Sequence, residues 1–343
     1  MRSSQNYSLA RVSAELGVSK TAVSRVLNGK ARESGISSRL QQQILELCDK
    51  VNYRPNIHAQ RMNCAHVKNI GVLVESMGGV DEHTPFGEYN LPQVLGGIAQ
   101  ACDQAGYRFT MQLYKPEMTE ERIFDWFKTR EIDGLLYYGF EMPERWLEAL
   151  VAENRHLVGI SINPSFGIPS ININNFEASF QLTEHLIAKG RRNFLYLAGV
   201  KASYPAEQRL AGFRAALQKA GIPFSEDQVF PADFDYAKTE KFINEYWQRG
   251  IKEDAIVCAN DCTAVAAISA LNSLGCRIPE QIAVAGADNI PVSSFVTPAI
   301  TTFDNLPSGQ GKAAFELLQR IIAGETKPGH VVLKTNLCLR NSA

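Results

Sequence analysis

The chain lacks the sequence features of membrane-spanning and secreted proteins. No run of about 18 uncharged apolar residues occurs, and the opening MRSSQNYSLARVS has no apolar core of the kind found in signal peptides. The seven cysteines are scattered and form no Cys-x-x-Cys pair. Buried, reduced thiols in a cytoplasmic protein without membrane contact are therefore expected.

Enzyme motifs are also missing. The six histidines are dispersed, and the sequence has no Gly-x-Ser-x-Gly elbow, no phosphate-binding loop and no readable pair of nucleophile and base. Asp81, Glu82 and His83 are consecutive, and such a lone cluster is rarely a set of metal ligands. The sequence thus predicts no catalysis, no metal site and no cofactor.

Charge is distributed unevenly along the 343 residues, a length that predicts two or three compact units. Residues 1–66 hold ten Lys and Arg against four Asp and Glu, a balance of +6, whereas the remainder carries −7. A basic N-terminal piece on an acidic body fits a module that binds a polyanion, joined to a body that does not.

The stretch GVSKTAVSRVLNG (17–29) has the pattern of a turn followed by a short helix with an N-cap at Ser19. A preceding helix capped by Ser8 meets it at Gly17, which makes a helix-turn-helix pattern, and in this motif the second helix enters the major groove. An ordinary solvated helical hairpin is the alternative. The side chains predicted to contact DNA on this helix are Lys20, Thr21, Ser24, Arg25 and Asn28.

A third helix is expected to begin near Ser37, close a small core over the first two, and stop before Pro55. The segment PNIHAQRMNCAH (55–66) has little to bury and is typical of a linker. Residues 59–62 nevertheless favour a helix, so a short helix that forms on a partner is expected here.

From Asn69 onward, apolar strand segments alternate with amphipathic helices, which indicates parallel sheets covered on both faces. About ten such units exceed one ordinary sheet and predict two doubly wound halves. The fold class is therefore α/β with an all-α head. The last expected elements are a strand over 300–304, a helix over 307–324 and one long strand over 330–340.

These segments, in this order, resemble the lac repressor family of bacterial transcription regulators over nearly the whole chain. The motifs that carry the resemblance are GVSKTAVSRVLNG, YRPN with AQRM, NIGVLV, IDGLL, RLAGFRAAL (209–217), CANDCTAVA (258–266), AVAGADN (283–289) and TPAITTFDN (297–305). The resemblance implies a homodimer of two-lobed bodies, similar to periplasmic sugar-binding proteins, with paired heads on DNA and a ligand between the lobes.

The expected domains follow the same resemblance. They are a helix-turn-helix domain over 1–54, a hinge over 55–68, and a core over 69–343 with one lobe from 69–162 and 292–324 and a second from 163–291 and 325–343. No tetramer-forming heptad follows the last expected strand, so a dimer is preferred over a tetramer.

The resemblance also assigns single residues. Met62 occupies the hinge position where the family usually has a leucine that wedges into the minor groove, and Arg61 beside it is predicted to contact DNA. Arg209 and Asp288 match the family's ligand-binding arginine and aspartate, with Asn260 and Phe234 as lesser contacts. A guanidinium, a carboxylate and an aromatic face suit a polyhydroxylated ligand.

Structural roles stay open for each of these positions. Arg209 can belong to a structural ion pair, Asp288 can cap the following turn, and Phe234 can belong to the core. At the corner before the helix over 261–275, Asp261 is expected to be the N-cap rather than a ligand contact.

The loop over 75–90 is longer than the family pattern and is either a lid over the ligand or a mobile solvated loop. Its Phe86, together with Tyr138 at the end of the strand segment over 132–138, completes the predicted effector contacts.

The function that the sequence predicts is a ligand-responsive transcriptional repressor. It is expected to bind a palindromic double-stranded DNA operator as a homodimer, with a sugar or sugar derivative as the small-molecule effector. A solute-binding protein of the same fold is the alternative class. The absence of a recognisable signal peptide and the basic head argue against that alternative.

Overall fold

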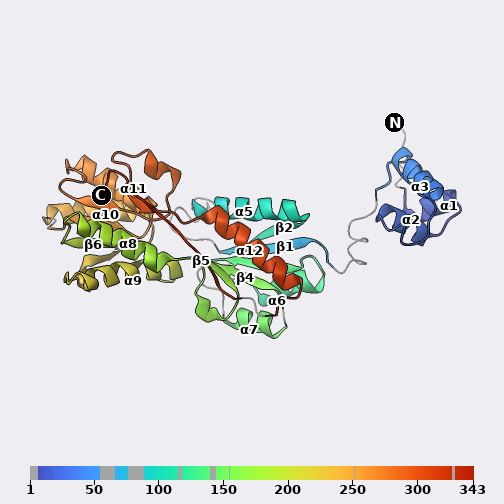
Figure 1. The fold of residues 1–343 in the computed structure, drawn as a ribbon, viewed down its shortest axis with the longest axis horizontal. Helices are drawn as coiled ribbons and strands as arrows, with labels where there is room; N and C mark the ends of the chain where they lie inside the picture. Colours follow the sequence, from blue (N-terminus) through green and yellow to red (C-terminus); the bar gives the residue numbers. More distant parts are fainter. Residues whose placement is uncertain are drawn as a thin grey trace. The chain divides into compact units, whose positions relative to one another are not determined.

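The computed structural model describes residues 7–54, 66–75, 89–114, 118–139, 144–153, 155–250, 252–326 and 329–343 (Figure 1). The chain divides into two compact units, residues 1–67 and 68–343. The first is a small helical head, and the second contains two α/β lobes. Among the described residues, no helix is both long and apolar enough to cross a membrane.

The head consists of three helices that share one apolar core, namely α1 (Leu9–Glu15), α2 (Lys20–Leu27) and α3 (Ser38–Lys50). Serine hydroxyls cap these helices, at Ser8 and Ser19 as predicted: Ser19 Oγ accepts the Ala22 N–H at 3.1 Å, and Ser8 and Ser37 cap the other two. The fully buried members of the core are Val12, Val23, Val26, Ala31, Ile44 and Cys48.

The first lobe contains a parallel sheet of strand order β2-β1-β3-β4-β5-β11. Helices α5 and α12 cover one face, and α6 and α7 cover the other. The elements are β1 (Asn69–Glu75), α5 (Asn90–Ala105), β2 (Arg108–Tyr114), α6 (Glu120–Lys128), β3 (Gly134–Tyr138), α7 (Glu144–Ala152), β4 (Leu157–Ile160), η1 (Pro164–Phe166), β5 (Ser170–Ile173), α12 (Pro307–Ile322) and β11 (Val331–Leu333).

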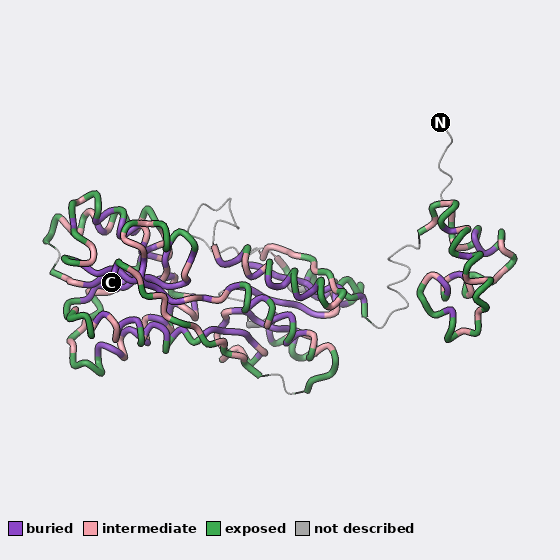
Figure 2. Tube along the Cα trace, turned by 45° about the horizontal axis from the view of Figure 1, so that its top comes forward, coloured by how far each residue is buried: buried purple, intermediate pink, exposed green. Residues whose placement is uncertain are grey.

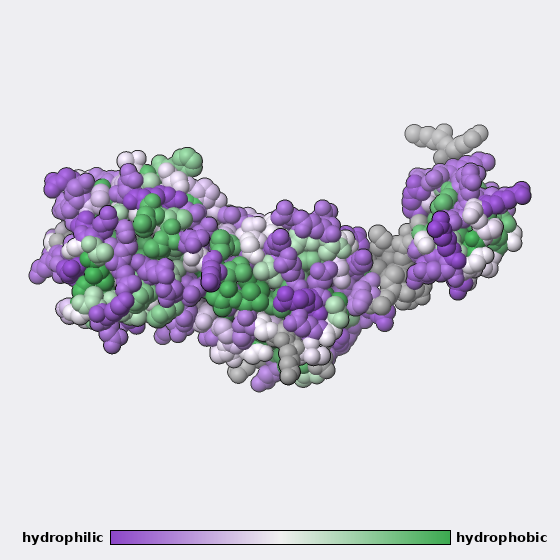
Figure 3. Space-filling view, viewed as in Figure 1, coloured by the Kyte–Doolittle hydropathy of each residue, from purple (hydrophilic) through white to green (hydrophobic). Residues whose placement is uncertain are grey.

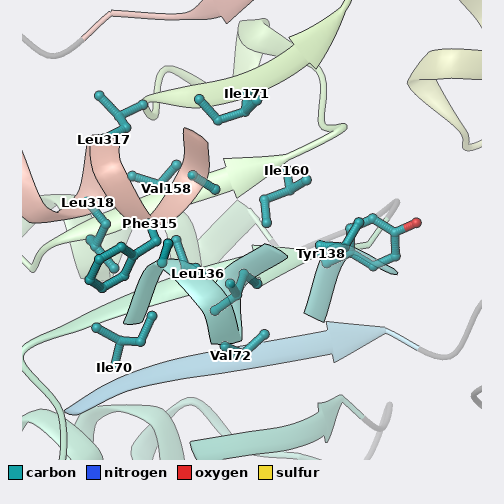
Figure 4. Close-up of a cluster of buried hydrophobic side chains, with 14 of the residues drawn as sticks. Ile70, Val72, Leu136, Tyr138, Val158, Ile160, Ile171, Phe315, Leu317 and Leu318 are labelled. Carbon is teal, nitrogen blue, oxygen red and sulfur yellow. The ribbon is translucent and has the colours of Figure 1, made fainter. Parts of the chain in front are cut away.

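A cluster of buried hydrophobic side chains fills the space between this sheet and α12. Figure 4 shows Phe315 and Leu318 of α12 above Ile70 and Leu136 of the central strands. Tyr138 lies at the end of the cluster, with its hydroxyl turned away from the other labelled side chains.

The second lobe contains a parallel sheet of order β7-β6-β8-β9, with α8 and α9 on one face and α10 and α11 on the other. The antiparallel pair β10-β12 adjoins it through bridges from Ala285 to Thr301 and from Asp288 to Asp304. The elements are α8 (Asn175–Ala188), β6 (Phe194–Ala198), α9 (Tyr204–Lys219), η2 (Glu226–Gln228), β7 (Val229–Pro231), α10 (Tyr236–Gln248), β8 (Ala255–Cys258), α11 (Asp261–Ser273), β9 (Ala283–Ala285), η3 (Pro291–Ser294), β10 (Thr302–Phe303) and β12 (Leu337–Cys338).

The chain passes between the lobes after β5, before α12 and after β11, so the expected lobe boundaries need correction. Strand β5, which the sequence did not predict, belongs to the first sheet, although the segment over 163–291 was expected in the second lobe. Residues 300–303 lie in the second lobe, not the first. The expected long strand over 330–340 is two short strands in different lobes, because residues 334–336 cross between them.

Burial follows these layers. Figure 2 shows buried segments along the strands and exposed segments along the outer sides of the helices. On the face in Figure 3, hydrophilic residues predominate and apolar residues gather in separate patches.

Candidate functional site

The outward side of α2 is polar and accessible, as the helix-turn-helix pattern predicts. Lys20, Thr21, Arg25 and Asn28 are exposed, whereas Ser24 is half-buried and its Oγ accepts the Asn28 amide at 3.3 Å. The opposite side of the helix is buried in the head core. One face of α2 is therefore fixed by packing, and the other offers basic and hydroxyl groups to a partner.

Three of the predicted contact residues cannot be placed. Arg61 and Met62 of the hinge and Phe86 of the long loop lie outside the described residues. Their roles stay predictions that rest on the sequence.

Arg209 is buried in the second lobe, on the first half of α9, with 4% of its surface exposed. Its Nη2 donates to Asp288 Oδ1 at 2.7 Å. Its Nε donates to Asn175 Oδ1 at 2.8 Å, and its Nη1 donates to the Ala259 carbonyl at 2.6 Å. The Phe303 ring lies 5.2 Å from the guanidinium carbon. Hydrogen bonds to three segments of the chain thus fix the plane of the Arg209 guanidinium.

Asp288 follows β9 in a turn with a backbone φ of 107°, a region that favours glycine. Its N–H donates to the Phe303 carbonyl at 2.9 Å. Burial raises the pKa of the Asp288 carboxyl, and the adjacent Arg209 guanidinium opposes that shift. The two side chains form a buried ion pair whose members depend on each other for charge compensation.

A hydrogen bond from the first lobe reaches this ion pair. Asn90, the first residue of α5, donates from Nδ2 to Asp288 Oδ2 at 3.3 Å. Asn90 and Asp288 are both largely buried. The carboxylate therefore contacts Arg209 of its own lobe and Asn90 of the other.

The remaining predicted effector contacts occupy other positions at the carboxyl ends of strands. Asn260 is the N-cap of α11, and its Oδ1 accepts the Thr263 N–H at 2.9 Å and the Thr263 hydroxyl at 2.7 Å. The expectation that Asp261 is this cap is wrong, because Asp261 is the first helical residue. The Oδ1 atom of Asn260 is thus engaged in capping α11.

Phe234 and Tyr138 are held mainly by apolar neighbours. The half-buried Phe234 ring packs so close to Gly199 that a Cβ there would lie 2.2 Å from ring Cζ. Tyr138 is 5% exposed and ends β3 within the first-lobe core. Arg209 and Asp288 are brought into direct contact; Phe234 and Tyr138 contribute aromatic surface in their own lobes.

The sequence did not identify Asn90, Asn175 or Phe303 as neighbours of the ion pair. Asn175 begins α8 two residues after β5, so its placement at the carboxyl edge of a sheet depends on recognising β5 in the sequence. Asn90 carries no comparable signal, since its contact depends on how the two lobes pack together.

Comparison with known proteins agrees with this architecture. Residues 9–56 match the family model of bacterial regulatory proteins, lacI family, and residues 183–343 match the periplasmic binding protein-like domain. The chain is 28% identical over 309 residues to the HTH-type transcriptional repressor PurR of Aliivibrio salmonicida (strain LFI1238), covering 89% of each protein. It is 27% identical over 341 residues to the HTH-type transcriptional regulator CelR of Thermobifida fusca, covering 97% of each.

Two solved structures are similar over nearly the full length. The lac repressor dimer bound to operator and the anti-inducer ONPF aligns with a TM-score of 0.86 at 23% identity, covering 98% of this chain and 99% of that one. A CelR–cellobiose complex aligns with a TM-score of 0.72 at 25% identity, covering 98% of this chain and 100% of that one. The chain thus has a helix-turn-helix domain of the lacI family of bacterial regulatory proteins, followed by a periplasmic binding protein-like domain.

Proposed function

We propose that this protein is a transcriptional repressor that binds a palindromic DNA operator as a homodimer and responds to a small polyhydroxylated effector, a sugar or sugar derivative. The observation that carries the effector part is the buried contact among Arg209, Asp288 and Asn90, which joins both lobes at one carboxylate. The exposed polar face of α2 supports the DNA part.

On DNA, the N-terminal end of α2 enters the major groove. Lys20 and Arg25 supply donors for guanine acceptors or phosphates, and Thr21 supplies a hydroxyl for a base edge. A dimer places two such helices on the two halves of a palindrome. Arg61 and Met62 of the hinge contact the minor groove at its centre.

In the core, the hydroxyl groups of an effector form hydrogen bonds with Arg209 and Asp288. These bonds replace the one that the two side chains make with each other. Because Asn90 reaches the same carboxylate from the first lobe, an occupant at this point changes the contact between the lobes. That change biases the lobe orientation, and thereby the hinges of the dimer, toward one of two states.

The DNA part is tested by selecting binding sites from a random double-stranded DNA library with the full-length protein. We expect a palindrome to be enriched. Arg25→Ala should abolish that enrichment, whereas Arg214→Ala, which alters an exposed ion pair of the core, should preserve it. Enrichment of the same palindrome by the Arg25→Ala variant would refute the assignment of α2.

The effector part is tested by thermal unfolding in the presence of sugars, sugar phosphates and nucleobases. A true effector at 100 times its dissociation constant stabilises the native state by about 2.7 kcal/mol. Asp288→Asn should remove this stabilisation, and an unchanged shift in that variant would refute the site.

A further inference from the structure

The turn that carries Asp288 adopts an unusual backbone conformation. Asp288 has a φ of 107° and the next residue, Asn289, a φ of 52°, although neither is glycine. Non-glycine residues persist in this region only where their surroundings hold them. The turn over 287–290 must therefore be fixed by contacts outside itself.

Asp261 supplies one such set of contacts. It is fully buried at the start of α11, and its N–H donates to the Ala287 carbonyl at 2.7 Å. Its Oδ2 accepts the Ile290 N–H at 3.0 Å, so one residue holds both ends of the turn. Its Oδ1 accepts the Thr302 hydroxyl at 2.7 Å.

Arg340, in the segment after β12, supplies a second set. Its Nη2 donates to Asn289 Oδ1 at 2.6 Å, and its Nη1 donates to the Ile300 carbonyl at 2.8 Å and to Ser293 Oγ at 3.1 Å. The backbone of Arg340 is itself anchored, because its N–H donates to Thr301 Oγ1 at 3.0 Å. The C-terminal segment therefore reaches the turn that carries the effector carboxylate.

We propose that Asp261 and Arg340 are positioning residues that hold the turn over 287–290, and thereby aim the Asp288 carboxylate at Arg209. Neither side chain bonds directly to Arg209 or to Asp288 among the contacts of the described residues. The inference rests on the proposed effector role of Asp288, but the geometric coupling that it describes can be measured without a ligand.

The test measures the energetic coupling between Arg209 and Asp288 in the folded protein. In the full-length protein, unfolding is measured for the wild type, Arg209→Lys, Asp288→Asn and the double variant, which together form a double-mutant cycle. The same cycle is repeated in variants that alter Asp261 or Arg340. In the wild-type background we expect a coupling of about tenfold or more in the unfolding equilibrium constant. Asp261→Ala and Arg340→Met should each reduce it to less than about twofold.

Two control backgrounds separate positioning from general loss of stability. Asp254 also accepts backbone N–H groups with its carboxylate, from Arg192 at 3.0 Å and Asn193 at 3.1 Å, but it precedes β8 at the amino end of the sheet. Asp254→Ala should therefore keep the coupling. Asp261→Asn, which preserves the shape and one acceptor oxygen for the Ile290 N–H, should keep most of it.

The outcomes are distinct. Unchanged coupling in Asp261→Ala, or in Arg340→Met if the first variant does not fold, would overturn the proposal, as would equal loss in Asp254→Ala. A second readout uses glucose, galactose, ribose and cellobiose. If one of these sugars stabilises the wild type, the sugar concentration that gives half of the maximal stabilisation should be about tenfold higher in Asp261→Ala and in Arg340→Met. If none stabilises the wild type, these four sugars are excluded as effectors, and the coupling alone decides the positioning roles.

Discussion

Asn90 and Asp288 lie in different lobes of the core, and a hydrogen bond of 3.3 Å from the amide to the carboxylate joins them. The same carboxylate is paired with Arg209 at 2.7 Å. A change at Asp288 therefore alters hydrogen bonds in both lobes.

Asn90→Asp should open the lobes. The variant replaces a donor with a second carboxylate beside Asp288, and loss of a hydrogen bond to a charged group costs about 1.5–3 kcal/mol. Small-angle X-ray scattering of the effector-free protein should report a larger radius of gyration. Asn69→Asp is the matched control, because Asn69 is similarly buried and its side chain bonds, among the described residues, within the first lobe, to Thr110 and the Glu131 carbonyl. An unchanged radius in Asn90→Asp would contradict the interlobe role.

Arg209→Ala should destabilise the core by about 3–5 kcal/mol, because it leaves a buried carboxylate without its partner. Chemical denaturation measures this change. Arg214→Ala should change stability by about 0–1 kcal/mol, since its ion pair with Glu226 is exposed. Similar losses in the two variants would show that burial of the Arg209 pair has no energetic consequence.

Gly97→Ala should destabilise the first lobe, whereas Gly96→Ala should not. A Cβ at Gly97 would lie 2.0 Å from the Ser308 carbonyl oxygen of α12, while nothing lies within 4 Å of one at Gly96. We expect a loss of about 1–3 kcal/mol at position 97 and a gain of up to about 1 kcal/mol at position 96. Thermal unfolding of both variants checks the close approach of α5 and α12, and equal effects would contradict it.

The sequence predicted the elements better than their lobes. Serine caps and apolar periodicity are local signals, so the three head helices and most core strands were predicted. The crossing segment over 334–336 has no such signal, because apolar residues continue on both sides of it. The strand ends there because of long-range hydrogen bonds, such as the one from the Asp304 N–H to the Asn336 carbonyl. The Asn90 contact likewise depends on distant parts of the chain.

Asp261 should make stability depend on pH. Burial raises the pKa of Asp261 to about 8, with the nearby Asp288 charge adding to the shift. The folded state therefore holds a proton that the unfolded state releases, and stability falls as the pH rises from about 4 to about 8. Relative to Asp261→Asn, the wild type should lose up to about 1.4 kcal/mol per pH unit in this window. Unfolding curves across pH measure this difference, and a pH-independent difference would contradict it.

The proposed link between effector and DNA is tested by the effect of the effector on operator affinity in the wild type and in Asp288→Asn. With the operator selected from random DNA and the sugar found by thermal unfolding, saturating sugar should change wild-type operator affinity about five- to 150-fold, and operator DNA should change sugar affinity by the same factor. Asp288→Asn should bind the operator like the effector-free wild type and show no response. A full response in Asp288→Asn would contradict the proposal that this carboxylate links the effector to DNA binding.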